Sequence, residues 1–218
     1  MDTKTSLASP FVMSFKPDDR LFFTSDTHFG HSNIIKFCSR PFKDVHEMNE
    51  VMVRNWNEVV KPGDTVFHLG DFAFGGSQLW SNMLDKLNGD IHLVLGNHDM
   101  KNLRQGYMSR FKSVSHQQVL RVGDRFVYLN HYPFLCYGGT YRNPKQVVYQ
   151  LFGHVHSRPN EIPEDIPDEE VKEILGKDVT RLGALFPTQY DVGVDNNNFT
   201  PVTFKEIDEK IQMRLTTT

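Results

Sequence analysis

Residues 91–99, IHLVLGNHD, join an apolar run to three polar side chains. The isoleucine, leucines and valine are typical of a strand that is buried on both faces, as strands of parallel sheets are. Gly96 ends the run, and Asn97, His98 and Asp99 follow at once. Because open α/β sheets bind ligands at the carboxyl ends of their strands, we expect these three side chains to lie at a functional edge of the sheet.

The same arrangement of a strand, an abrupt stop and ligand-type side chains recurs along the chain. Four further expected strands end in this way: residues 20–25 before Asp26 and His28, 64–69 before Asp71, 125–130 before His131, and 147–152 before His154 and His156. These side chains come from distant parts of the chain. We expect them to converge on the edge that Asn97 and His98 occupy.

Two amphipathic helices are expected between the first three strands. Apolar residues recur at three- and four-residue steps over residues 45–59, after the helix-capping pair Asp44 and Glu47. The second helix is expected over residues 77–87, with Ser77 as its cap. The order strand, helix, strand, helix, strand predicts right-handed crossovers and a parallel core sheet.

The rest of the chain has a different pattern. Gly123-Asp124 predicts a hairpin between residues 114–122 and 125–130. Further expectations concern segments with weaker patterns: an irregular lead-in over residues 1–19, a surface insertion at about 158–188 with one short helix near 168–175, a final hairpin from 190–194 and 202–204, and a closing helix over 206–213.

Composition limits the class of protein. The 218 residues are enough for one well-buried core, so we expect a single domain over residues 1–218. A net charge of -3 argues against long nucleic acids as partners. Two cysteines make no disulfide framework, and no signal peptide or bilayer-spanning run is evident, which predicts a cytoplasmic protein without a membrane partner.

The residue types at the strand ends suit a pair of divalent cations. A carboxylate between two ions can bridge them and offset their repulsion, while histidines and an amide oxygen complete each coordination shell. Two ions about 3.5–4 Å apart can share a water, lower its pKa and hold a phosphoryl oxygen during in-line attack. The oxygen and nitrogen donors, without a thiolate, favour Mn²⁺, with Fe, Ni²⁺ or Zn²⁺ as alternatives.

In chain order, the motifs D-x-H, G-D, G-N-H-D, a histidine after a strand and G-H-x-H extend from residue 26 to residue 156. Five motifs in this order are far more specific than any one of them. The sequence resembles the calcineurin-like metallophosphoesterases, and more narrowly their small bacterial and phage single-domain members. The resemblance implies an α/β fold of four layers, α/β/β/α, in which a sandwich of two β-sheets is flanked by helices.

The resemblance also implies a role for each strand-end residue. One metal would be held by Asp26, His28 and His156, the other by Asn97, His131 and His154, and Asp71 would bridge both. His98 would lie beside the metals without binding them and would hydrogen-bond a phosphate oxygen or protonate the leaving oxygen. Asp99 would orient His98.

Three residues are candidates for contact with substrate: His31, Arg40 and Arg142. The alternative for His31 is that it pins its loop, and a solvated surface explains Arg40 equally well. Where many family phosphatases carry Asp-Arg after Gly-Asp, this chain has Phe72-Ala73-Phe74. Phe72 and Phe74 could stack on a base, or pack beneath the loop.

The sequence therefore predicts a two-metal-dependent phosphoesterase acting on a small phosphate ester or nucleotide. The missing Asp-Arg pair and the compact size favour a phosphodiester of a nucleotide, cyclic or linear, although monoesters can be hydrolysed by the same ligands. A phosphomonoesterase is one alternative. The other is a non-catalytic interaction module that kept the fold, which the complete ligand set disfavours.

Overall fold

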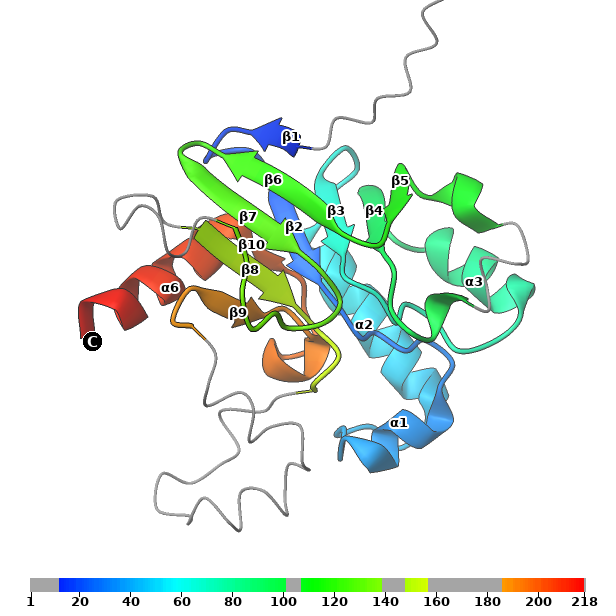
Figure 1. Ribbon diagram of the computed structural model, residues 1–218. Helices are drawn as coiled ribbons and strands as arrows, with labels where there is room; N and C mark the ends of the chain where they lie inside the picture. The colour runs from blue at the N-terminus through cyan, green and yellow to red at the C-terminus, as the bar shows by residue number, and fades with distance from the viewer. Residues whose placement is uncertain (1–11, 101–106, 139–147, 157–185, 218) are drawn as a thin grey trace, which may run out of the picture.

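The computed structural model describes residues 12–100, 107–138, 148–156 and 186–217 (Figure 1). Two five-stranded sheets pack face to face. Sheet one has the order β10 (Val202–Thr203), β2 (Leu21–Thr24), β3 (Thr65–His68), β4 (Asp90–Val94) and β5 (Ser113–Ser115). Sheet two has the order β1 (Val12–Phe15), β6 (Gln118–Val122), β7 (Arg125–Leu129), β8 (Val148–Phe152) and β9 (Gln189–Asp191).

Two inner strands of sheet one, β2 and β3, carry buried apolar side chains on both faces because both faces are covered. Phe22 and Val66 belong to the core beneath the helices, whereas Phe23 and Phe67 belong to the core between the sheets. β2 pairs with β3, β3 with β4 and β4 with β5, all in parallel. Their carboxyl ends therefore meet at one edge, as the sequence predicts.

Helices cover the outer face of sheet one, with α2 behind its strands and α3 to the right of β5 in Figure 1. These are α1 (Ser32–Phe37), α2 (Val45–Val59) and α3 (Ser77–Leu84). In α2, Met48, Met52 and Trp56 are buried against the sheet. The expected cap is confirmed, since the Asp44 carboxylate accepts a hydrogen bond from the Glu47 backbone N–H at 2.9 Å.

The C-terminal helix α6 (Phe204–Thr217) provides the second helical flank. It contacts β2, β9 and β10, and so bridges both sheets. Phe204, Ile207 and Ile211 enter the core between the sheets, and the Lys210 ammonium donates a hydrogen bond to the Tyr190 hydroxyl at 2.7 Å. The expected sandwich of two sheets flanked by helices is confirmed.

Four local expectations are wrong. Residues 12–15, expected to be irregular, form β1, which gains its hydrogen bonds by pairing in parallel with β6. Residues 114–122 divide between β5 in sheet one and β6 in sheet two. Residues 190–194 and 202–204 form no hairpin, because β9 joins sheet two and β10 joins sheet one. Helix α3 begins after Gly76 without a side-chain cap, so Ser77 is its first residue and not its cap.

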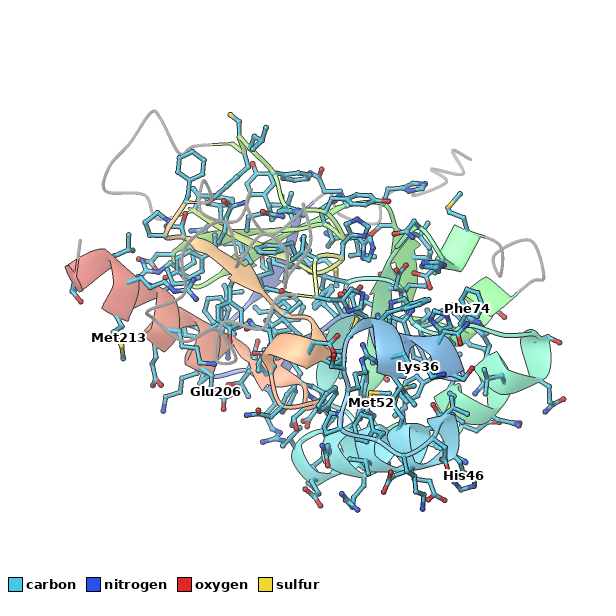
Figure 2. The ribbon with its side chains drawn as sticks, turned by 90° about the horizontal axis from the view of Figure 1, so that it is seen from below. Lys36, His46, Met52, Phe74, Glu206 and Met213 are labelled. Atoms are coloured by element: carbon cyan, nitrogen blue, oxygen red, sulfur yellow. The ribbon has the colours of Figure 1, made fainter. Side chains whose placement is uncertain are left out.

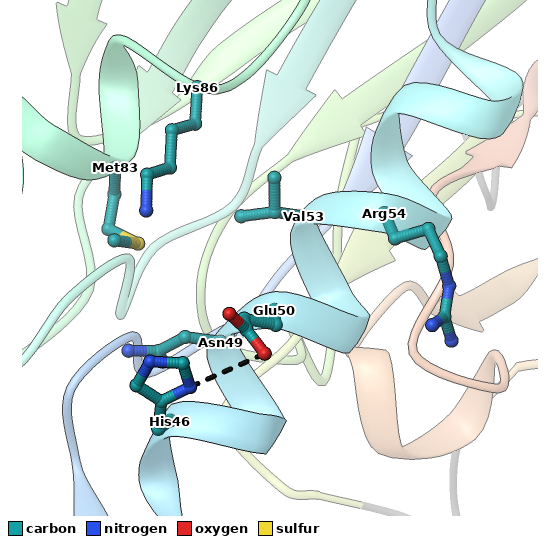
Figure 3. A pocket seen from close by; sticks show the side chains of 7 residues that line it. All are labelled: His46, Asn49, Glu50, Val53, Arg54, Met83 and Lys86. Atoms are coloured by element: carbon teal, nitrogen blue, oxygen red, sulfur yellow. Dashed lines mark ion pairs between the residues drawn. The ribbon is translucent and has the colours of Figure 1, made fainter.

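A cavity of ≈ 450 Å³ lies between α2 and α3 (Figure 3). It is lined by His46, Asn49, Glu50, Val53, Arg54, Met83 and Lys86. No residue expected to bind metal lines this cavity. In the described part of the chain, no helix has both the length and the apolar character needed to cross a bilayer.

Candidate metal centre

The loops after β2, β3, β4, β7 and β8 bring the expected ligands together. Of three groups of described side chains whose potential ligand atoms lie within 4.8 Å of one another, two consist wholly of expected ligands. The first group is Asp26, His28 and His156, and the second is Asp71, His131 and His154. Below, these are called cluster one and cluster two. Their members are those that the sequence assigns to a metal pair, and the Asn97 Oδ1 atom lies 3.1 Å from His131 Nε2 beside cluster two.

The backbone at these loops is unusual. Five of the cluster residues have a positive φ: Asp26 (57°), His28 (48°), Asp71 (55°), His154 (71°) and His156 (49°). Left-handed backbone at a residue with a side chain is uncommon and costs about 1–3 kcal/mol. Such conformations gather at functional sites, where their cost is tolerated because they aim particular side chains.

Two glycines of the motifs allow the loops to approach one another closely. A Cβ atom at Gly96 would overlap the Asp71 carboxylate, and one at Gly153 would overlap the Asp26 carboxylate and the Ser25 hydroxyl. The glycines of G-N-H-D and G-H-x-H therefore leave the space that the two carboxylates occupy.

Cluster one contains buried polar atoms that lack hydrogen bonds within the described residues. These are Asp26 Oδ1 and both ring nitrogens of His28. Asp26 Oδ1 lies 4.0 Å from His28 Nε2 and 3.9 Å from His156 Nε2. Donor atoms around one cation, with bonds of about 2.0–2.2 Å, are spaced about 3–4 Å apart. A cation among these atoms would satisfy groups that are otherwise costly to bury, so the residues fit a metal ion.

In cluster two, Asp71 faces both groups. Its Oδ2 atom lies 3.6 Å from His131 Nε2 and 3.6 Å from His28 Nε2, which is the placement a bridging carboxylate requires. His131 Nδ1 donates a hydrogen bond to the Leu69 carbonyl at 2.8 Å. Because Nδ1 carries the proton, Nε2 keeps the lone pair that a metal ion needs.

Burial dominates the electrostatics of this edge. It raises the pKa of Asp71, and it raises that of Asp99 to about 6. Burial also lowers the pKa of His154, and together with the nearby His156 it lowers the pKa of His28 well below its usual range. Burial therefore favours the neutral imidazoles of His28 and His154, which are the form that binds metal.

His98 lies beside the clusters with its side chain 40% exposed. Its backbone N–H donates to Asp71 Oδ1 at 2.9 Å, and its Nε2 atom lies 3.9 Å from Asp71 Oδ2. The imidazole is thus within reach of both solvent and the carboxylate that faces the two clusters.

Asp99 does not orient His98 as expected. Its buried carboxylate accepts hydrogen bonds from three backbone N–H groups, those of Asp71 and Gly96 at 2.8 Å and of Phe72 at 3.0 Å. These bonds join the loop after β3 to the loop after β4. Asp99 therefore holds two ligand-bearing loops in register, and we correct its expected role accordingly.

Arg40 differs from expectation as well. Its side chain is fully buried, so it has no face toward solvent from which to contact a substrate. The guanidinium donates to both carboxylate oxygens of Asp195 at 2.8 Å, and to the carbonyls of Asp26 at 2.7 Å and Thr27 at 3.1 Å. Its hydrogen bonds are made inside the protein, behind cluster one.

Asp195 is the residue that the sequence analysis missed. Its Oδ2 atom accepts a hydrogen bond from His156 Nδ1 at 2.7 Å. Although burial opposes it, this bond helps to raise the pKa of His156 to about 11, and His156 and Arg40 bring that of Asp195 to about 2. Its position could have indicated a site residue, because Asp195 comes shortly after β9, as the other site residues come after their strands.

The remaining residues fall into three sets. His31 is partly buried, and its ring stacks on Phe74 with centroids 4.2 Å apart, whereas Phe72 is buried in the core. His68 is buried beside Thr27, and burial lowers its pKa to about 3. Arg142, and residues 158–185 of the expected insertion, lie outside the described residues.

The chain is similar to several known proteins. The chain is 45% identical over 82 residues to an uncharacterized protein of Methanocaldococcus jannaschii, a match that spans 37% of this chain and 47%, just under half, of that protein. It is 30% identical over 162 residues to the Gene 66 protein of Mycobacterium phage L5, covering 62% of this chain and 77% of the phage protein. A solved structure of a protein of unknown function from Aquifex aeolicus superposes with a TM-score of 0.60 at 25% identity, covering 87% of this chain and 97% of that one.

The match to a protein family covers most of the chain. Residues 20–194 match the calcineurin-like phosphoesterases, and this range contains all the motifs described above. Family membership supports metal-dependent phosphoester hydrolysis and implies divalent metal ions, for which the two clusters offer His and Asp donors. From this match we conclude that the chain belongs to the calcineurin-like phosphoesterase family.

Proposed function

We propose that this phosphoesterase hydrolyses a phosphodiester of a nucleotide, cyclic or linear, with two divalent ions held in clusters one and two. The observation that carries the proposal is the position of Asp71 Oδ2, 3.6 Å from a histidine of each cluster. Bound ions would activate water for attack on phosphorus and offset the charge that develops on the phosphoryl oxygens. The oxygen and nitrogen donors favour Mn²⁺.

The chain's own residues have distinct tasks in this proposal. Asp26, His28 and His156 would hold one ion, Asn97, His131 and His154 the other, and Asp71 both. His98, whose imidazole is 40% exposed, would hydrogen-bond a phosphate oxygen or give a proton to the leaving oxygen. Asp99 would keep the loops of Asp71 and His98 together through its three backbone bonds.

Exposed rings beside the clusters support a nucleotide as the substrate. Phe74 is 46% exposed, stacks on His31, and lies 5.5 Å from the His98 ring, measured between centroids. Figure 2 shows Phe74 close to α1, the helix that carries Lys36. Beside cluster two, Tyr132 is 44% exposed with its ring 4.7 Å from that of His154. Aromatic faces next to a phosphate site can stack on a base, at about 1–3 kcal/mol per base.

A panel of substrates tests the proposal. The full chain, loaded with Mn²⁺ and with its metal content measured, would be given p-nitrophenyl phosphate, bis-p-nitrophenyl phosphate, 2′,3′- and 3′,5′-cyclic nucleotides, and single-stranded DNA. We expect turnover of bis-p-nitrophenyl phosphate and of a nucleotide diester. Turnover of p-nitrophenyl phosphate alone would overturn the diester assignment, and inactivity with both metals bound would favour an interaction module.

A further inference from the structure

The buried pair of Arg40 and Asp195 lies directly behind cluster one. The two residues are 155 positions apart in the chain, and their side chains are 0% and 2% exposed. A carboxylate buried without a partner is costly, and the two 2.8 Å bonds from the guanidinium compensate that cost. The pair therefore places a stable hydrogen-bond acceptor where solvent does not reach it.

That acceptor is bonded to one of the expected metal ligands. Asp195 Oδ2 accepts a hydrogen bond from His156 Nδ1, so the nitrogen left to bind a metal ion is Nε2, which lies 3.9 Å from Asp26 Oδ1. A carboxylate on the far nitrogen of a ligating histidine fixes both the tautomer and the orientation of the ring.

The same guanidinium holds the loop of the other two ligands. Arg40 donates to the carbonyls of Asp26 and Thr27, within the segment where Asp26 and His28 adopt left-handed backbone. One buried cation thus restrains the backbone of Asp26 and Thr27 directly and the ring of His156 through Asp195. In cluster two the ring of His131 is fixed by the Leu69 backbone carbonyl, and the link to the Asp26 loop is a backbone bond, from the His154 N–H to Asp26 Oδ2 at 2.8 Å.

We infer that Asp195 and Arg40 are positioning residues that act through His156 and the Asp26–His28 loop, and that the metal affinity of cluster one depends on them while that of cluster two does not. The inference rests on the proposed metal-binding role of the clusters. Because the two clusters differ in these supporting contacts, removal of the Arg40–Asp195 pair should weaken the binding of one ion more than that of the other.

Metal titration of the full-length protein tests this inference without relying on activity. Chelator-stripped protein would be titrated with Mn²⁺, and free Mn²⁺ would be counted by electron paramagnetic resonance. Wild type is expected to bind two ions. In Asp195→Asn and in Arg40→Lys, one site is expected to weaken about 10–100-fold and the other to keep its affinity.

Asp64→Asn is the matched control. Arg20 and Asp64 form a pair with the same two-bond geometry, at 2.7 and 2.8 Å, away from both clusters and with the Arg20 side chain 57% exposed. This variant is expected to bind both ions as wild type does. Unchanged affinity at both sites in folded Asp195→Asn overturns the inference, and if that variant does not fold, Arg40→Lys provides the same comparison.

A second background separates positioning from general support of the fold. In His156→Ala the ligand is already absent, so adding Asp195→Asn is expected to lower Mn²⁺ affinity by much less than it does in the wild-type background. An additive loss, or equal weakening of both sites, would assign the pair a purely structural role. Wild-type protein that binds no Mn²⁺ would overturn the proposed function itself, whereas two tightly bound ions without hydrolysis would leave the inference standing and count against the function alone.

Discussion

The carboxylate of Asp99 accepts a hydrogen bond from the backbone N–H of Asp71 at 2.8 Å, although the two residues follow different strands. Together with the bonds from Phe72 and Gly96, it fixes the relative positions of the loops that carry Asp71, Asn97 and His98. Asp99→Ala would leave three backbone donors without this acceptor. We expect the free energy of unfolding to fall by roughly 2–4 kcal/mol, measured by urea denaturation. Asp85→Ala, at an exposed ion pair with Arg110, is the control and should change it by less than about 1 kcal/mol.

Asp71→Ala should prevent two ions from binding together. The Oδ2 atom of Asp71 faces both clusters, so its loss removes the shared donor and the charge that offsets repulsion between the ions. We expect the bound Mn²⁺ of dialysed protein, measured by mass spectrometry, to fall from two ions to one or none. Retention of two tightly bound ions would contradict the bridging role.

His98→Ala should separate metal binding from catalysis. The ring is half-exposed and belongs to neither cluster, so metal content should stay at the wild-type value. If His98 assists proton transfer, kcat should fall by about 10²–10⁴-fold. His116→Ala, at an exposed position between β5 and β6, is the control and should keep full activity. Normal turnover in His98→Ala would refute its role.

Phe74→Ala should distinguish substrates that carry a base from those that do not. Loss of a stacking partner worth about 1–3 kcal/mol should raise KM for a nucleotide diester about 5–150-fold. The KM for the corresponding abasic phosphodiester should not change. Steady-state kinetics on both substrates provides the comparison, and an equal change in both would assign Phe74 to the shape of the loop.

The Arg20–Asp64 pair should contribute to stability only above acidic pH. The hydrogen bond from Arg20 holds the pKa of Asp64 below its usual range. A carboxyl whose pKa is depressed by folding stabilises the protein above its unfolded pKa of about 3.9, and this contribution disappears as pH falls through the folded pKa. The difference in unfolding free energy between wild type and Asp64→Asn should therefore be constant from about pH 7 to pH 5 and shrink below pH 4. Denaturant titrations across this range would measure it.

Local patterns were enough to predict the strand ends, because each combines an apolar run with a glycine or a polar stop. Local patterns failed for strands that are stabilised mainly by pairing with a strand distant in sequence. β1 has four residues and β10 has two, and each is a sheet edge whose neighbour lies far away in sequence. The Arg40–Asp195 pair was missed for the same reason, since no local signal joins residues 155 positions apart. Asp99 was misassigned because adjacency to His98 suggested contact, whereas its carboxylate is directed toward the loop after β3.

Each cluster takes its donors from both sheets. Asp26 and His28 follow β2 in sheet one, while His156 follows β8 in sheet two; Asp71 follows β3, while His131 and His154 follow β7 and β8. Neither sheet alone supplies all the ligands of either cluster. A bound ion would consequently hold the two sheets together at their shared edge. Neither metal site could form until sheet two has packed on sheet one.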